Sequence, residues 1–421
     1  MYATQSGFDF QNHDDIIIDK NKWDFPSKNT LNSTHGCHTY VAAMNPHLAK
    51  MLLIKLVPPG GNVLDPFVGG GAVMVEALNN DIPGCGIDVN PLAALISKVK
   101  TTYIHKSTLL REYNRIIDAF SSNNVDPWNF PKNYKIDFWF KPYMILPLSK
   151  LANLIGVIED ENVKDVFRLI FSSTIRDVSL TYRGEIRLRR LQGDDYERFN
   201  PDVLMKFKER AESTIHRVSN LPKKHIIQVK IGNAMKMEFE NNQFSTIICS
   251  PPYGDDRNGV GYFQFSKNML FWLGLTYEQL QQNKDMFLGG VKNNKYPPES
   301  ETLEMTIEQI KENPVPSNLK AVEECISFYH DYQIALQEMA RVCSGKIAIV
   351  IGNRTLSQTH IDNAKITTEL LGNIGYSLEK YYYREINKKR IPVMQPGGGQ
   401  RDRSGGGLIN KEHTLIYGPV K

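Results

Sequence analysis

The stretch Asn62–Gly71 reads NVLDPFVGGG, an apolar run that passes through an acidic residue into three consecutive glycines. A short apolar run bounded by turn residues predicts a buried strand, here Asn62–Phe67. Glycines directly after a strand let the chain turn tightly and let a ligand approach the backbone. A helical pattern follows at Ala72–Leu78, and a second strand is predicted at Cys85–Val89. This order predicts the beginning of a nucleotide-binding α/β sheet.

The same pattern continues in the second half of the chain. Helical periodicity is predicted over Ile326–Val342 and near Asn363–Leu371. Strands that alternate with helices indicate a doubly wound parallel sheet with right-handed crossovers. The further predicted strands are Ile227–Gly232, Phe244–Cys249, Lys346–Ile351, Glu379–Glu385 and His413–Tyr417.

Interruptions of this alternation divide the chain into three regions. Residues 1–99 hold an N-terminal segment and the first part of the Rossmann-like domain. Residues 100–226 are mostly helical in pattern, so we expect a helical insertion between the second and third strands. Residues 227–421 complete the domain, with a polar, loop-rich insertion at 276–318 and a loop rich in glycine and arginine at 387–411. Connections of such length usually carry function or a small fold of their own.

Composition and cysteine usage exclude several classes of protein. The 50 basic and 46 acidic residues leave a net charge of +4, which excludes a histone-like polycation but not a basic face. The five cysteines are scattered and form no CxxC pair, so we expect no disulfide framework and no metal site. The run His35-Gly36-Cys37-His38 is interpreted as an ordinary loop. The sequence shows neither a signal peptide nor an apolar run of about 18 residues that could span a membrane, which predicts a cytoplasmic protein.

Two acidic residues end the first two predicted strands, and their positions favour one class of ligand. Asp88 ends the second strand, where an acid in nucleotide-binding sheets accepts hydrogen bonds from ribose hydroxyls. Asp65 lies at the strand end just before the glycine turn, where its charge would repel the pyrophosphate of NAD. The same charge suits the ammonium or sulfonium group of S-adenosylmethionine, which also carries a ribose. The glycines are contiguous rather than spaced as GxGxxG, so we expect S-adenosyl-L-methionine.

The motif Ser250-Pro251-Pro252-Tyr253 directly follows the fourth predicted strand. Proline has no N–H to donate, so two prolines end the strand and stiffen the turn. The carbonyls of Ser250 and Pro251 then point in constant directions at the carboxyl end of the sheet, where ligands bind. Such acceptors can orient an NH₂ group toward a methyl donor, and the Tyr253 ring offers a stacking surface for a flipped-out base.

Together these motifs resemble the amino-methyltransferase family of DNA methyltransferases. The resemblance rests on DPFVGGG, on GIDVNPLA at Gly86–Ala93 and on SPPY, and it covers most of Asn62–Ala93 and Gln228–Pro419. Further similarity to modification methylases lies at Ser250–Leu275 and Arg384–Pro392.

The resemblance implies a class I Rossmann-like methyltransferase fold and assigns roles to residues. The catalytic motif is Ser250–Tyr253, whose serine form is typical of cytosine-N4 enzymes. A segment before the first strand, His38–Tyr40, is expected to cover the methionine end of the cofactor. Asn233 departs from the family, which often has an acid there. The implied cofactor-binding residues are Asp65, Phe67, Gly69, Gly71, Asp88, Asn233 and Tyr40.

A dense basic run, TYRGEIRLRR, lies inside the helical insertion and makes it a candidate for DNA binding and target recognition. Arginine binds phosphate and guanine in a bidentate manner, although runs of charge are often only solvated helix faces. The candidate DNA-binding residues are Arg183, Arg187, Arg189 and Arg190.

We therefore predict an S-adenosylmethionine-dependent enzyme that methylates cytosine N4 within a specific duplex DNA sequence by base flipping and direct transfer. Cys249 precedes the motif and is interpreted as a buried strand residue, not as a nucleophile. A restriction-modification context, with a cognate restriction endonuclease as a functional partner, is expected. The alternatives are adenine-N6 methylation of DNA, guanine-N2 methylation of RNA and a non-catalytic partner subunit.

Overall fold

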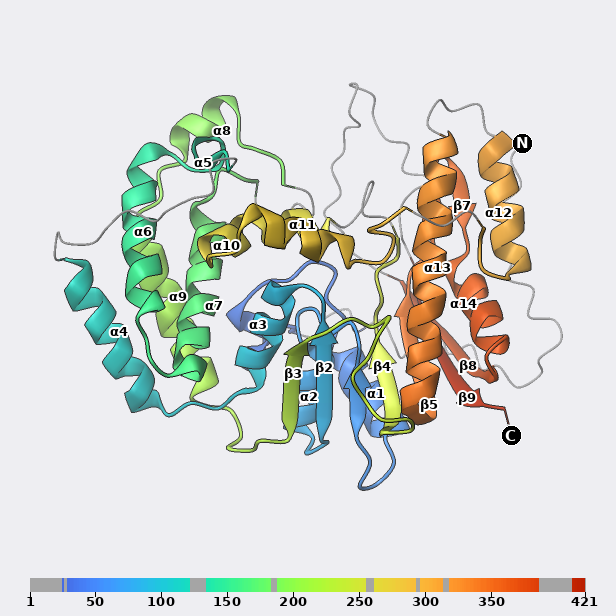
Figure 1. The fold of residues 1–421 in the computed structure, drawn as a ribbon. Helices are drawn as coiled ribbons and strands as arrows, with labels where there is room; N and C mark the ends of the chain where they lie inside the picture. The colour runs from blue at the N-terminus through green and yellow to red at the C-terminus, as the bar shows by residue number, and fades with distance from the viewer. Residues whose placement is uncertain are drawn as a thin grey trace.

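The computed structural model describes Phe25 and residues 29–121, 134–182, 188–254, 261–292, 296–312, 318–385 and 411–420. A seven-stranded sheet lies at its centre (Figure 1). In spatial order the strands are β3 (Ile227–Ile231), β2 (Gly84–Asp88), β1 (Val63–Asp65), β4 (Phe244–Cys249), β5 (Cys343–Ile351), β9 (Lys411–Pro419) and β8 (Tyr376–Glu385).

The predicted Rossmann-like methyltransferase fold is confirmed, with one correction to its sheet. All seven predicted strands are present. The neighbouring strands β3, β2, β1, β4 and β5 run parallel to one another. The sheet is not wholly parallel, because β9 runs antiparallel to both β5 and β8. Antiparallel neighbours need no crossover helix, which is why the sequence shows no helical pattern between the last two strands.

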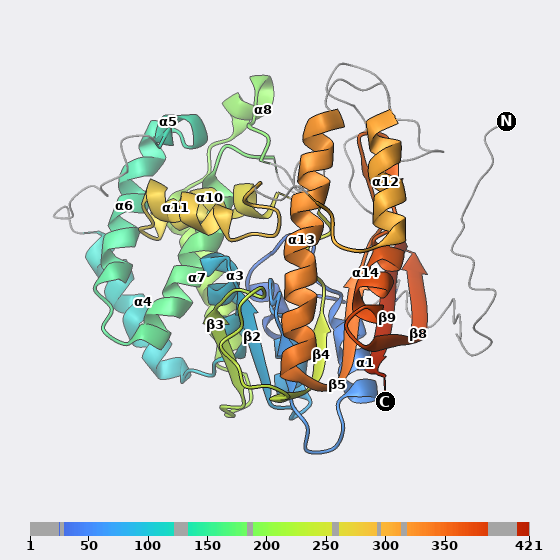
Figure 2. The ribbon, with the colours of Figure 1, turned by 45° about the vertical axis from the view of Figure 1, so that its right-hand side comes forward.

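Helices cover both faces of the sheet (Figures 1 and 2). On one face, α1 (Pro46–Leu56) and α2 (Ala72–Asn79) share a buried cluster with β1, β4 and β5. On the other face, α13 (Asn318–Val342) and α14 (Asn363–Gly372) share a second cluster with the same strands. Consecutive isoleucines of β4 fall into opposite clusters, because successive side chains of a strand point to opposite faces. Burial on both faces explains why these strands are continuous apolar runs.

The predicted insertion between the second and third strands is helical and forms a lobe of its own beside the sheet (Figure 1). The sheet reaches it through α3 (Pro91–Thr101), and α10 (Tyr262–Trp272), which follows the SPPY motif, packs into it. The Trp272 ring meets Phe140 and Phe171 edge-on at 5.8 and 6.0 Å between ring centroids. We call this unit the helical lobe; its helices are α4 (Lys106–Phe120), α5 (Ile136–Trp139), α6 (Pro142–Gly156), α7 (Glu161–Val178), α8 (Gly193–Arg198) and α9 (Val203–Val218).

The second insertion is more ordered than its polar composition predicts. The stretch 276–318 holds α11 (Tyr277–Asp285) and α12 (Glu301–Glu312). Thr276 and Gln279 form a capping box that starts α11. In α12 the apolar side chains recur at helical spacing, and this stripe packs into the cluster that α13 shares with the sheet. Within the described ranges, no helix is long and apolar enough to cross a membrane.

Candidate active site

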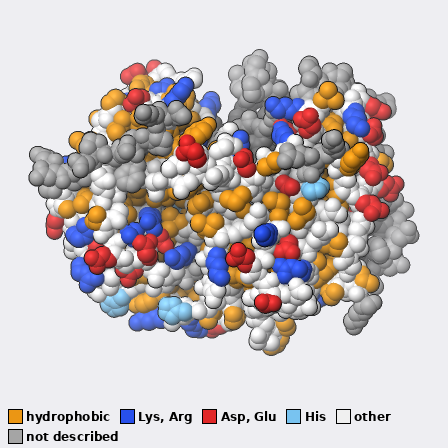
Figure 3. Space-filling model, in the orientation of Figure 1, with side chains coloured by type: hydrophobic (Ala, Val, Ile, Leu, Met, Phe, Trp, Pro, Cys, Tyr) orange, Lys and Arg blue, Asp and Glu red, His pale blue; other side chains and the backbone are white. Residues whose placement is uncertain are grey.

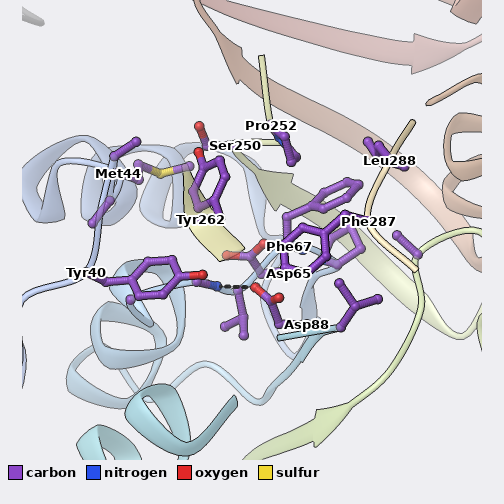
Figure 4. A pocket seen from close by; sticks show the side chains of 18 of the residues that line it. Tyr40, Met44, Asp65, Phe67, Asp88, Ser250, Pro252, Tyr262, Phe287 and Leu288 are labelled. Atoms are coloured by element: carbon purple, nitrogen blue, oxygen red, sulfur yellow. Dashed lines mark hydrogen bonds between the residues drawn. The ribbon is translucent and has the colours of Figure 1, made fainter. Parts of the chain in front are cut away.

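A pocket opens at the carboxyl ends of β1, β2 and β4, where ligands bind in open α/β sheets (Figure 4). Its empty space is about 780 Å³, a figure that includes the open solvent at its mouth. The residues that line it and enter the argument below are Tyr40, Met44, Asp65, Phe67, Gly69, Gly70, Asp88, Asn233, Ser250, Pro252, Tyr262, Met286, Phe287 and Leu288.

The lack of side chains in the glycine turn allows the segment that contains Tyr40 to pack against it. Gly69 and Gly71 have φ angles of +48° and +80°, a region that favours glycine. A Cβ atom on Gly69 would lie 3.3 Å from the Tyr40 ring, and one on Gly70 would lie 3.2 Å from Tyr40 Cβ. The structure thus places Tyr40 directly against the glycine turn. Gly71 does not line the pocket, and its side of the turn packs on Ser97 of α3.

A buried lysine, which sequence reasoning missed, joins this segment to the turn. Lys100 of α3 is 3% exposed, and its ammonium donates to the carbonyls of Gly70 at 3.0 Å and His38 at 3.1 Å. Burial lowers the pKa of Lys100 to about 8. The predicted loop around His38 in fact contains a 3₁₀ helix, Ser33–Cys37, in which His35 pairs with Glu76 at 2.8 Å. A lysine at the end of an apolar helical pattern carries no signal of such a contact.

The two predicted cofactor acids lie in the pocket, Asp65 as a buried carboxyl group and Asp88 as a partly buried one (Figure 4). Asp88 accepts hydrogen bonds from the backbone N–H groups of Gly69 and Asn90, both at 2.9 Å. Asp65 accepts one from the N–H of Phe67 at 3.1 Å. Burial raises the pKa of Asp65 to about 8, with a further contribution from the charge of Asp88, and raises the pKa of Asp88 to about 6.

These acids fit a ligand that brings its own positive charge and hydroxyl donors. In the part of the chain that the structure describes, neither carboxylate pairs with a basic side chain, although a buried charge is costly unless it is paired. The glycine turn leaves room for the ligand beside them. A sulfonium or ammonium group near Asp65 and a ribose near Asp88 would satisfy both. The two carboxyl groups and the glycine turn therefore fit S-adenosylmethionine.

The SPPY motif lies beside these acids, but only some of its residues line the pocket. Ser250 and Pro252 line the pocket. Tyr253 is buried at 8% exposure and is not a lining residue; its hydroxyl donates to Glu412 Oε1 at 3.0 Å. Cys249 is fully buried at the end of β4, and burial raises the pKa of its thiol well above its ordinary value. The prediction that Cys249 is a buried strand residue is confirmed.

Other lining residues come from segments that the sequence did not connect with the site. Asn233 follows β3 and lines the pocket as predicted, with its Oδ1 accepting from the N–H of Met235 at 2.9 Å. Tyr262 of α10 lies across the pocket from Phe67 and Phe287 (Figure 4). Met286, Phe287 and Leu288 follow α11, in the stretch predicted to be loop-rich. Their apolar character is common to core residues, so no sequence signal marks them as lining a site.

The two arginines of the basic run that the structure describes, Arg189 and Arg190, do not line the pocket. Arg183 and Arg187 lie outside the described residues. Arg189 stacks on Tyr182 with its guanidinium carbon 4.0 Å from the ring centroid. Arg190 lies over Phe138 and Tyr196 at 4.9 and 5.0 Å, and its Nε donates to the Phe138 carbonyl at 2.7 Å. These residues form a group of cations and aromatic rings on the helical lobe rather than a solvated helix face.

Charge on the visible surface does not mark a binding face by itself. On the side drawn in Figure 3, basic and acidic side chains are interspersed, and apolar side chains gather near the middle. This distribution agrees with a net charge of only +4. Any attraction of this face for an anionic partner must therefore come from particular side chains and not from a uniform positive field.

Comparison with known proteins gives two relatives. No family model matches the chain. The type II methyltransferase M.MvaI of Kocuria varians is 31% identical over 406 residues, which cover 89% of this chain and 89% of the relative. The type II methyltransferase M.MjaII of Methanocaldococcus jannaschii is 24% identical over 169 residues, which cover 40% of this chain and 26% of the relative. The first similarity therefore extends over nearly the whole of both chains.

Proposed function

This chain belongs to the type II DNA methyltransferases, and from that premise we propose that it transfers a methyl group from S-adenosylmethionine to the exocyclic N4 amine of cytosine in duplex DNA. One observation carries the proposal. The buried Asp65 and the partly buried Asp88, which pair with no basic side chain among the described residues, share a pocket with Ser250 and Pro252 of the SPPY motif. A site for a cationic nucleoside thus adjoins a set of rigid carbonyl acceptors.

Residues of the first half of the chain would hold the cofactor. When bound, S-adenosylmethionine supplies an electrophilic methyl group on a sulfonium. Asp65 would stabilise positive charge, and Asp88 would accept from ribose hydroxyls. Tyr40 would cover the methionine end beside the glycine turn. Phe67, Asn233 and Phe287 line the remaining part of the pocket, where apolar rings and an amide suit the adenine.

The SPPY motif would orient the base. The carbonyls of Ser250 and Pro251 accept hydrogen bonds from the target amine, so the nitrogen lone pair is directed toward the methyl donor. Orientation of this kind supplies much of the acceleration in a direct transfer. Cys249 takes no part as a nucleophile, because its thiol is fully buried and burial holds it protonated. A covalent thiol intermediate is therefore not part of the proposal.

The helical lobe is proposed to contact the DNA. Arg189 and Arg190 are held on aromatic rings, which keeps their guanidinium planes in place at a small entropic cost. Duplex DNA would be bound by these arginines together with Arg183 and Arg187. The relatives named as type II methyltransferases support a functional pairing with a cognate restriction endonuclease.

The test is mass spectrometry of nucleosides from duplex DNA incubated with the protein and S-adenosylmethionine labelled in its methyl group. We expect label in N4-methylcytosine. Label in N6-methyladenine would overturn only the base assignment, because the same pocket can present either amine and the choice rests on Ser250. Label in 5-methylcytosine would contradict direct transfer to an amine. DNA without label would contradict the activity itself.

A further inference from the structure

Tyr253 is held at its hydroxyl by a residue from the far end of the chain. Its O–H donates to Oε1 of Glu412 on β9 at 3.0 Å. The second oxygen of Glu412 accepts from Nε of Arg384, its partner across the β8–β9 pair, at 2.5 Å. The three side chains are buried or nearly so, with 12% and 10% of the Arg384 and Glu412 side chains exposed. Burial and the charge of Glu412 raise the pKa of Tyr253 well above its ordinary value, so its hydroxyl remains a donor.

The backbone of the same residue is held by a second side chain. Asn363, the first residue of α14, is fully buried, and its Nδ2 donates to the carbonyl of Tyr253 at 3.1 Å. The same amide donates to the carbonyl of Gly352, just after β5, at 2.7 Å. Its Oδ1 accepts from the hydroxyl of Tyr329 on α13. Asn363 therefore ties the end of the SPPY motif to the end of a central strand and to a helix.

The motif needs such contacts because its own backbone offers few. Pro251 and Pro252 have no N–H, so this turn cannot be held by the ladder of hydrogen bonds that holds the strand before it. Gly254 follows with φ at +77°, a conformation in which the chain bends away. Contacts at the carbonyl and at the hydroxyl restrain Tyr253 at both ends of the residue. The ring between them is left with a single orientation.

We propose that Glu412 and Asn363 are positioning residues that hold Tyr253 and, through it, set the position of the SPPY turn at the pocket. The inference rests on the proposed function, in which the SPPY motif places the base. Tyr253, Glu412 and Asn363 do not line the pocket, so the two residues act through Tyr253 on the neighbouring Pro252 and Ser250, which do. The test uses Glu412, because its contact with Tyr253 can be altered from either side by a small change: loss of the tyrosine hydroxyl or loss of the carboxylate charge.

The test compares Tyr253→Phe, Glu412→Gln and the double variant. The first removes only the hydroxyl. The second keeps the shape of the side chain but removes the charge that the tyrosine hydroxyl and Arg384 share. We expect kcat at saturating DNA and cofactor to fall roughly tenfold or more in each single variant, since a misplacement of about 1 Å can cost 100-fold. The double variant should be no slower than the worse single one, because Tyr253→Phe removes, and Glu412→Gln weakens, the same contact between the two side chains. Cofactor affinity should stay within about twofold of wild type, because neither residue lines the pocket.

Tyr376→Phe is the matched control. Tyr376 is also buried in the cluster that α13 shares with the sheet, and its hydroxyl also has a hydrogen bond, to the carbonyl of Cys343 at 3.2 Å. It lies on β8 away from the pocket, so this variant should lose stability without losing kcat. If Tyr253→Phe and Glu412→Gln behave like Tyr376→Phe, with kcat within about twofold of wild type, the inference is overturned. Tyr253→Ala distinguishes a failure of this inference from a failure of the proposed function. Wild-type kcat in that variant would overturn the proposed role of the SPPY motif itself.

Discussion

Replacement of Asp65 by asparagine should change how the stability of the ligand-free protein depends on pH. The Asp65 carboxyl is 3% exposed, and burial raises its pKa from 3.8 to about 8. The folded protein therefore keeps this proton over a range of pH in which the unfolded chain has released it. A group whose folded pKa is raised contributes stability that is complete below the unfolded pKa and is lost as the pH rises through the folded pKa.

The expected change in the free energy of unfolding follows from the one proton that the folded state binds at Asp65. Between about pH 5 and pH 7.5 the folded state binds roughly one proton more at this site, so the free energy of unfolding falls by about 1.4 kcal/mol per pH unit. Across two pH units, Asp65 alone should cost the wild type about 2.7 kcal/mol. The asparagine side chain of the variant has the same shape and no proton to release, so this part of the pH dependence should vanish in Asp65→Asn.

Urea unfolding of the ligand-free wild type and variant at about pH 5.5 and pH 7.5 measures the difference. Asp194→Asn is the control, because the Asp194 side chain is 86% exposed and should leave the wild-type pH dependence in place. Calorimetry on the same samples should show weaker binding of S-adenosylmethionine to Asp65→Asn, since asparagine cannot release a proton to give the negative charge proposed to face the sulfonium. Equal changes in stability between the two pH values for wild type and Asp65→Asn would refute the reasoning from burial.

Three shorter predictions test other parts of the site. Gly71→Ala should destabilise the protein by at least about 1–2 kcal/mol in thermal or urea unfolding, because φ is +80° and the new Cβ would meet Ser97 Oγ at 2.8 Å; Gly156→Ala, with nothing within 4 Å, is the control. Reversal of Arg189 and Arg190 to glutamate should weaken DNA binding and reduce its dependence on salt, while cofactor affinity is unchanged; DNA affinity equal to wild type at every salt concentration would return these residues to a structural role. Cys249→Ala should retain substantial turnover in the methylation assay, and an inactive but folded variant would argue for a thiol mechanism.

Local sequence patterns were sufficient for the parts of the fold and site that depend on neighbours in the chain. The strands before Asp65 and Ser250 are continuous apolar runs because they are buried on both faces. The pocket residues Asp65 and Ser250 were predicted from their positions at the ends of these strands. The helices of residues 276–318 were missed because polar residues outnumber the apolar stripe, although α12 buries Leu303 and Ile307 at helical spacing.

Contacts between residues that are far apart in the chain could not be predicted from local sequence patterns. The hydroxyl of Tyr253 and its partner Glu412 are 159 residues apart, and an acid on a late strand is usually a surface residue. Phe287 reaches the pocket only because α11 ends beside it. The reversal of β9 is likewise set by pairing with two strands that precede it, and alternation along a single strand does not reveal its direction.

The position of β9 has a consequence for the order in which the protein can be completed during its synthesis. β9 lies between β5 and β8, both of which leave the ribosome earlier. Until residues 411–419 emerge, β5 and β8 each present an open edge of unpaired backbone groups, a state in which chains tend to associate with one another. Glu412 arrives on that same strand, so a nascent or truncated chain that stops before it has a cofactor pocket without the partner of Tyr253.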